Sequence, residues 1–307
     1  MSKSPSRFNR AALAGTAVAA AAFALSAPAH AEQIVGLIEG NRLIRFDSAT
    51  PGTTSAPVTV TGLGAGQSLV GIDLRPTTGM IYGLASNGSI YTLNATTGAA
   101  TLVTTISGAV LSGTSFGVDF NPVPDLAGLA SFRITSDTGQ NLRVNVNPGA
   151  SLGLAAVDTL LNGAGTALSA SAYDNNDLNP VTGTTLYGIF GNTLFKQNPA
   201  NAGTLIEPRS LGVNTGAFTG FDISASGASF ASLTAPDALT SSFYSINLVT
   251  GPATLIGAFA AFGGAGSRVV DITAAMAPIP EPETYALMLM GLAGVAFVAR
   301  RRRAKAG

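Results

Sequence analysis

The sequence predicts an all-β protein, a β-propeller-like ring of five four-stranded blades, and three observations support this prediction. Short runs of alternating apolar and polar residues are separated by turn residues, as in strands that bury one face. A pattern of such runs recurs with a period near 50 residues, which is typical of a propeller blade. The repeat region also starts part-way through one unit and ends after the first strand of another. Pairing these ends would complete the fifth blade and close the ring, leaving no open sheet edge.

Residues 1–31 are expected to form a signal peptide that is not part of the ring. A cationic start precedes a short apolar stretch at residues 11–25. Ala29 and Ala31 form a small-x-small cleavage site, so Glu32 is the expected first residue of the mature protein. The alternative is an uncleaved anchor, for which the apolar stretch is short.

The propeller-like domain is expected at residues 32–277 and begins in mid-unit. Alternating runs predict strands at 33–38, 42–47 and 57–60, which would be the second, third and fourth strands of a blade. A complete unit follows at residues 70–103, where an Asn-Gly turn between two alternating runs is typical of a β-hairpin.

The opening strand of this unit recurs four times, and each copy contains an aspartate. The five residues are Asp73, Asp119, Asp174, Asp222 and Asp271, spaced 46, 55, 48 and 49 residues apart. A residue type that the repeat requires in every blade is expected to hydrogen-bond strand or turn backbone. The alternative is that two of these carboxylates form the acid and base of a glycan-cleaving site.

The central domain resembles a bacterial family known as domain of unknown function 4394. The resemblance is carried by the stretch Phe132–Asn145, by Gly71–Pro76 and by the Leu186-Tyr187-Gly188 segment. It spans most of residues 32–275 and implies a propeller-like fold. The family name implies no activity.

The C-terminal segment has the organisation of a sorting signal. Residues 278–284 form a linker that contains Pro280-Glu281-Pro282, and residues 285–307 are expected to form a helix. Its apolar run, residues 285–299, would be about 22 Å long as a helix, short of the ~30 Å hydrocarbon core of a bilayer. Four arginines follow it: Arg300, Arg301, Arg302 and Arg303.

This order of motif, apolar helix and arginine cluster resembles the PEP-CTERM sorting tail of Gram-negative bacteria. The resemblance implies a protein that passes through the secretion machinery and is held transiently at the inner membrane. An exosortase would then remove the tail, and the protein would reach the cell surface or the extracellular polysaccharide matrix. A simple tail anchor is the alternative.

Composition excludes several kinds of chemistry. The mature domain has eight Lys and Arg against 14 Asp and Glu, a net charge of −6, and its cations are not clustered, which argues against a nucleic-acid partner. The single histidine, His30, leaves with the signal peptide, and the chain has no cysteine or tryptophan. Histidine triads, thiol nucleophiles and metal sites built on nitrogen or sulfur are therefore excluded.

Two further groups of residues are candidate binding sites. Arg133 and Arg143 flank a predicted turn, where they would form either a clamp for an anionic ligand or cross-strand ion pairs to Asp137 or its neighbours. Asp174, Asn176 and Asp177 lie in a loop rich in oxygen ligands. This loop suits calcium but lacks the EF-hand pattern, and a turn between two strands is the alternative.

The sequence therefore predicts a non-enzymatic, exported binding or structural module that requires no cofactor and has extracellular polysaccharide as a candidate partner. Two alternatives remain. One is a secreted propeller enzyme that acts on glycans through carboxylates. The other is a calcium-stabilised adhesin.

Overall fold

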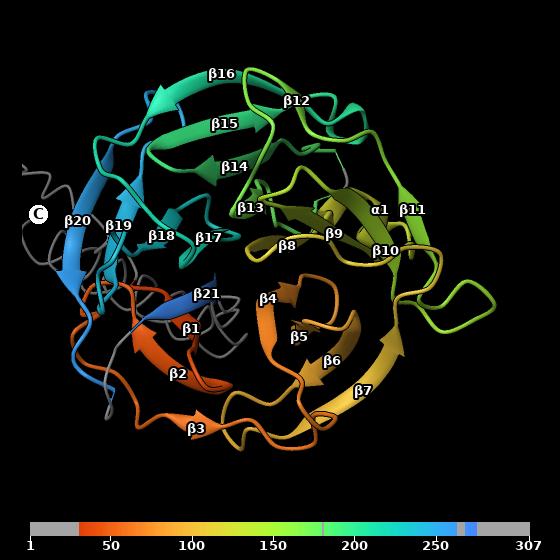
Figure 1. The fold of residues 1–307 in the computed structure, drawn as a ribbon, viewed down its shortest axis with the longest axis horizontal. Helices are drawn as coiled ribbons and strands as arrows, with labels where there is room; N and C mark the ends of the chain where they lie inside the picture. Colours follow the sequence, from red (N-terminus) through yellow and green to blue (C-terminus); the bar gives the residue numbers. More distant parts are fainter. Residues whose placement is uncertain (1–30, 180, 263–267, 275–307) are drawn as a thin grey trace, which may run out of the picture. The chain divides into compact units, whose positions relative to one another are not determined.

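The structure, a computed structural model, describes residues 31–179, 181–262 and 268–274. These residues form five β-sheets arranged around one axis, with β4, β8, β13, β17 and β21 nearest the centre (Figure 1). The predicted signal-peptide and sorting helices and the Pro-Glu-Pro linker lie outside the described residues. Within the described part of the chain, no helix combines the length and apolar character needed to span a bilayer.

The blades follow one another along the chain, and apart from β12 in blade 3 and β21 in blade 5 the strands pair with their sequence neighbours. Blade 1 contains β4 (Leu69–Arg75), β5 (Met80–Ala85), β6 (Ser89–Leu93) and β7 (Ala100–Thr105). Blade 2 contains β8 (Phe116–Phe120), β9 (Ser131–Ser136), β10 (Asn141–Asn145) and β11 (Ala155–Val157). Blade 3 contains β13 (Ala170–Tyr173), β14 (Leu186–Phe190), β15 (Thr193–Gln197), β16 (Thr204–Ser210) and β12 (Asn162–Gly163). Blade 4 contains β17 (Thr219–Ile223), β18 (Ser229–Leu233), β19 (Ser242–Ile246) and β20 (Ala253–Ala258).

Blade 5 is built from both ends of the domain, as predicted. Its strands are β21 (Val269–Ala274), β1 (Gln33–Ile38), β2 (Arg42–Asp47) and β3 (Val58–Thr59). β21 and β1 pair in antiparallel register, with Ala274 opposite Ile34 and Asp271 opposite Leu37. The ring is thus closed by main-chain hydrogen bonds between segments more than 200 residues apart, so the inner-facing edge of β1 is paired by β21.

Three short elements were not predicted, and one of them is a 3₁₀ helix, η1 (Ala200–Ala202). Blade 3 has a fifth strand, because the connection from blade 2 passes along its outer edge and β12 pairs with β16 in parallel. Asn162 fixes this connection through a hydrogen bond from its Nδ2 to the carbonyl oxygen of Ala202 at 2.7 Å. A short helix, α1 (Pro122–Leu126), follows β8 and is capped by Asn121, whose side chain accepts from the Val123 N–H.

The core consists of apolar layers between the faces of neighbouring blades. Tyr82 and Leu84 of blade 1 pack with Phe116 and Val118 of blade 2, and the same kind of layer recurs around the ring. Alternating side chains of each strand face opposite neighbours, which explains why nearly every inner-strand residue is buried.

The inner strands approach one another closely. This explains why Gly117 and Gly220 stand two residues before the aspartates Asp119 and Asp222. A Cβ on Gly117 would lie 2.3 Å from the backbone nitrogen of Ser171 in β13. A Cβ on Gly220 would lie 2.7 Å from the backbone nitrogen of Ile272 in β21. Only glycine leaves room for this approach.

Candidate functional site

The registers of the inner strands show which repeated aspartates are equivalent. In blade 1, Asp73 lies opposite the tyrosine of Tyr82-Gly83. In blade 3, the residue opposite the tyrosine of the matching Tyr187-Gly188 pair is Ala172, and Asp174 lies beyond the end of β13. The expected equivalence is therefore wrong for Asp174, which lies two residues beyond Ala172, the position in blade 3 that matches Asp73.

The expectation is also wrong for Asp271. In blade 5, the residue opposite the valine of Val35-Gly36 is Thr273, whereas Asp271 lies opposite Leu37, two residues earlier on β21. Thr273 therefore occupies the level of Asp73, and its Oγ1 donates a hydrogen bond to Asp73 Oδ1 at 3.1 Å. Carboxylates are present at this level on only three of the five inner strands.

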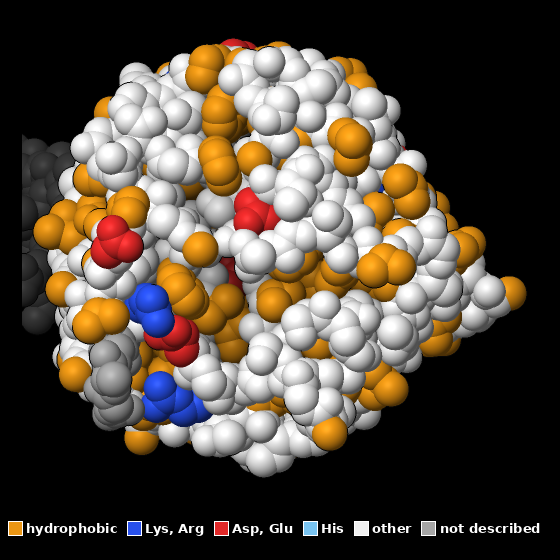
Figure 2. All heavy atoms as spheres, in the orientation of Figure 1, with side chains coloured by type: hydrophobic (Ala, Val, Ile, Leu, Met, Phe, Trp, Pro, Cys, Tyr) orange, Lys and Arg blue, Asp and Glu red, His pale blue; other side chains and the backbone are white. Residues whose placement is uncertain are grey.

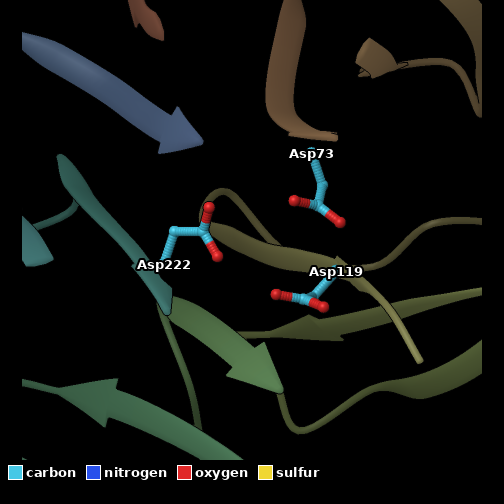
Figure 3. Close-up of side chains that lie close together, drawn as sticks. All are labelled: Asp73, Asp119 and Asp222. Carbon is cyan, nitrogen blue, oxygen red and sulfur yellow. The ribbon is translucent and has the colours of Figure 1, made fainter. Parts of the chain in front are cut away.

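These three carboxylates converge on the propeller axis. Asp73, Asp119 and Asp222 each have an oxygen within 4.8 Å of an oxygen of the other two, and all three residues are buried. Figure 3 shows the three carboxyl groups pointing toward one another from different strands. Within the described residues no lysine or arginine forms an ion pair with any of them.

The aspartates also hydrogen-bond backbone of the next inner strand, which agrees with the expected structural role. Asp73 Oδ2 accepts from the Phe120 N–H at 2.7 Å, and Asp222 Oδ2 accepts from the Ala274 N–H at 2.6 Å. Asp271 Oδ2 accepts from the Ile72 N–H at 2.9 Å. These bonds link neighbouring blades near the axis, where no β-ladder joins them.

Burial raises the pKa values of the clustered carboxyl groups. Desolvation is the largest cause for Asp73 and Asp119, whose pKa values lie well above the usual value, and the negative charges of the neighbouring aspartates add to it. Burial likewise raises the pKa of Asp222 to about 6, against the opposing hydrogen bonds from the Ala274 and Ile223 N–H groups.

The two ends of the axis differ in their openings. Near the ends of the inner strands, Asp73, Asp222 and Asn176 line a cavity of about 10 Å³, the size of one water molecule. Near their starts lies a mouth of about 300 Å³, lined by aliphatic side chains, by Glu39, and by uncharged polar groups and aromatic rings. They include Asn41, Ser68, Thr114, Ser115, Phe116 and Phe218. The face seen in Figure 2 likewise carries few charged side chains.

Arg133 and Arg143 lie directly opposite each other on β9 and β10. Both bind Asp158, at 2.7 Å from Arg133 Nη1 and 2.8 Å from Arg143 Nε, and not the predicted Asp137. Arg133 is fully buried and also donates to the side chains of Tyr173, Asn141 and Asn201. Arg143 is 36% exposed and lines a surface pocket of about 450 Å³.

Comparison with known families decides the affiliation of the chain. The family described as "Domain of unknown function (DUF4394)" matches residues 42–273. This chain belongs to that family. The PEP-CTERM protein-sorting motif matches residues 278–303, directly after the DUF4394 domain. This motif implies export, sorting to the cell surface and processing by an exosortase.

Similarity of the DUF4394 domain to individual proteins is distant. No curated protein matches the chain. A putative 6-phosphogluconolactonase from Bacteroides uniformis is 12% identical, with a TM-score of 0.40 over 75% of this chain and 82% of that chain. The crystal structure of a nidogen/laminin complex gives 15% identity and a TM-score of 0.44, over 80% and 86%. At these identities and scores the similarities carry no information about activity.

The loop after β13 in the DUF4394 domain largely binds its own backbone. Asp174 Oδ1 accepts from the Thr185 N–H at 2.5 Å, and Asp177 Oδ1 accepts from the Asn179 N–H at 3.0 Å. Asn176 departs from this pattern, because it lines the cavity beside the clustered aspartates.

Two contributors to the site were missed from the sequence. Glu32 is buried, its Oε1 accepts from Ser224 Oγ at 2.9 Å, and its charge raises the pKa of Asp222. Asp158 joins the two arginines. Neither residue belongs to a repeated motif, so the sequence gives no signal for them.

Proposed function

We propose that the mature protein is a non-enzymatic binding or structural module of the cell surface or the extracellular polysaccharide matrix. The observation that carries this proposal is the PEP-CTERM motif at residues 278–303, which directly follows a domain closed by its own ends. Closure by β21 and β1 makes the domain independent of its tail, so the tail can be removed without opening a sheet.

The wide mouth of the axis supports a binding role. Its hydroxyl and amide groups are uncharged donors and acceptors, which suit the hydroxyl groups of a sugar. The half-buried ring of Phe218 also lines the mouth, and the Arg268 guanidinium covers one of its faces at 4.3 Å from the ring centre. Glu39 holds that guanidinium through bonds of 2.7 and 2.8 Å. A neutral polysaccharide is therefore the ligand class that this surface favours.

The buried carboxylates give little support to the glycan-cleaving alternative. A glycosidase needs its two carboxyl groups on either side of a bound sugar. The cavity beside Asp73 and Asp222 is about 10 Å³, which leaves room for a water molecule and not for a sugar ring.

The test uses the full chain, expressed with its signal peptide and purified after export. Binding to matrix polysaccharide from the producing cells is measured by co-sedimentation and calorimetry. Ala217→Trp, at the exposed rim of the wide mouth, is expected to weaken binding at least tenfold. The matched control Ala49→Trp, beyond the far end of β2, should bind like the unmodified protein. Absence of binding, or equal loss in both variants, would refute the proposed role of the mouth.

A further inference from the structure

The three converging carboxylates have the spacing of a single calcium site. Calcium binds oxygen ligands at about 2.3–2.6 Å, so two ligands on opposite sides of the ion are about 4.8 Å apart. The carboxylate oxygens of Asp73, Asp119 and Asp222 lie within 4.8 Å of one another. One calcium ion could therefore reach all three without movement of the strands, whereas magnesium keeps several of its own waters, for which the cavity of about 10 Å³ leaves no room.

Three buried oxygens of this region have no hydrogen-bond partner among the described residues: Oε2 of Glu32 and two others. One is Oδ1 of Asp119, a residue that is only 1% exposed. The other is Oδ1 of Asn176, whose Nδ2 donates to the carbonyl oxygen of Ile223 at 2.8 Å. That bond fixes the orientation of the amide, so the oxygen is left facing inward. Such an oxygen requires a hydrogen donor or a cation, because its burial is otherwise costly.

The ionisable side chains around the axis are all acids. Asp271 on β21 and Glu32 before β1 add to the three carboxylates, and Tyr173 on β13 is the titratable residue of the remaining inner strand. Within the described residues no lysine or arginine forms an ion pair with the three aspartates. A bound cation would supply the missing positive charge.

We propose that the DUF4394 domain binds one calcium ion on the propeller axis, coordinated by Asp73, Asp119 and Asp222. Asn176 Oδ1 lies at the small cavity beside Asp73 and Asp222 and supplies a neutral oxygen on the entry side. The ligands come from β4, β8 and β17, so the ion ties blades 1, 2 and 4 together at the axis. This site shares Asn176 with the predicted calcium loop but not its aspartates, because Asp174 and Asp177 accept hydrogen bonds from backbone N–H groups of the loop.

The test measures calcium binding by the full chain purified after export and stripped with a chelator. Calorimetry with calcium chloride should give one ion per chain, and calcium should raise the melting temperature more than magnesium does. Asp119→Asn keeps the shape of the side chain and removes one ligand charge, and it should weaken calcium binding at least tenfold. Asp177→Asn and the exposed Asp237→Asn serve as matched controls and should bind like the unmodified protein.

A measurement on the unmodified protein keeps the proposal testable if Asp119→Asn does not fold. At pH 5 to 8 saturating calcium should raise the melting temperature above its value in a chelator. If calcium changes neither the heat signal nor the melting temperature at any of these pH values, the cluster holds protons only and the proposal is wrong. It is equally wrong if Asp177→Asn removes binding while Asp119→Asn retains it, because the ion then lies in the loop.

Discussion

Gly117→Ala should destabilise the domain strongly, although it adds a single methyl group. The added Cβ would lie 2.3 Å from the Ser171 nitrogen and 2.5 Å from the Ala170 carbonyl carbon, about 1 Å closer than an ordinary contact near 3.4 Å. Both atoms belong to the backbone of β13, so relief requires that two inner strands of a closed ring move apart. Overpacking of this kind costs typically about 1–3 kcal/mol, and the closed ring favours the upper end.

The loss is measurable by thermal and urea unfolding of the exported protein. About 3 kcal/mol corresponds to a fall in melting temperature of roughly 6–12 °C for a domain of this size. Gly216→Ala is the matched control, since its nearest neighbour, the Pro236 Cα, lies at 3.5 Å. Adding Ser171→Gly to Gly117→Ala should not restore stability, because the Ser171 nitrogen remains. If Gly117→Ala unfolds like the control, the close approach of β8 and β13 does not limit the sequence.

Three further predictions concern the arginine pair, the aspartate cluster and the tail. Arg133→Met should cost about 3–5 kcal/mol in urea unfolding, because it breaks a buried ion pair and removes the donor to the Asn201 side chain. Arg143→Met should cost clearly less, and equal losses would contradict this account. The folded-state pKa of Asp222, about 6, exceeds the ordinary value near 3.9, so the folded state binds the extra proton and this contribution to stability is lost between about pH 4 and pH 6. In a chelator, the melting temperature of the unmodified protein should therefore fall relative to Asp222→Asn over this range, and a constant difference would count against it. Glu281→Ala in the sorting motif should prevent removal of the tail, and intact-mass spectrometry of the exported protein should then show the added mass of the retained tail. If the variant has the same mass as the processed unmodified protein, Glu281 is not needed for removal of the tail.

The sequence alone was sufficient to predict the blades and their closure. Alternation within a strand and turn residues between strands are local properties, and the expected strands at 33–38 and 42–47 match β1 and β2. The two incomplete units at the ends predicted a shared blade, and β21 pairs with β1 as expected. The fifth strand of blade 3 was not predictable, because β12 has two residues and no repeat partner.

The tertiary structure alone decided which side chains meet on the axis. Five aspartates looked alike in the sequence, but the strand registers leave Ala172 and Thr273 at the level where Asp73, Asp119 and Asp222 converge. The physical reason is that a shift of two residues along a strand keeps a side chain on the same face and changes its level. Composition and repeat period do not show at which height along the propeller axis a side chain lies. The carboxylate cluster can therefore be recognised only when strands about 50 residues apart are placed side by side.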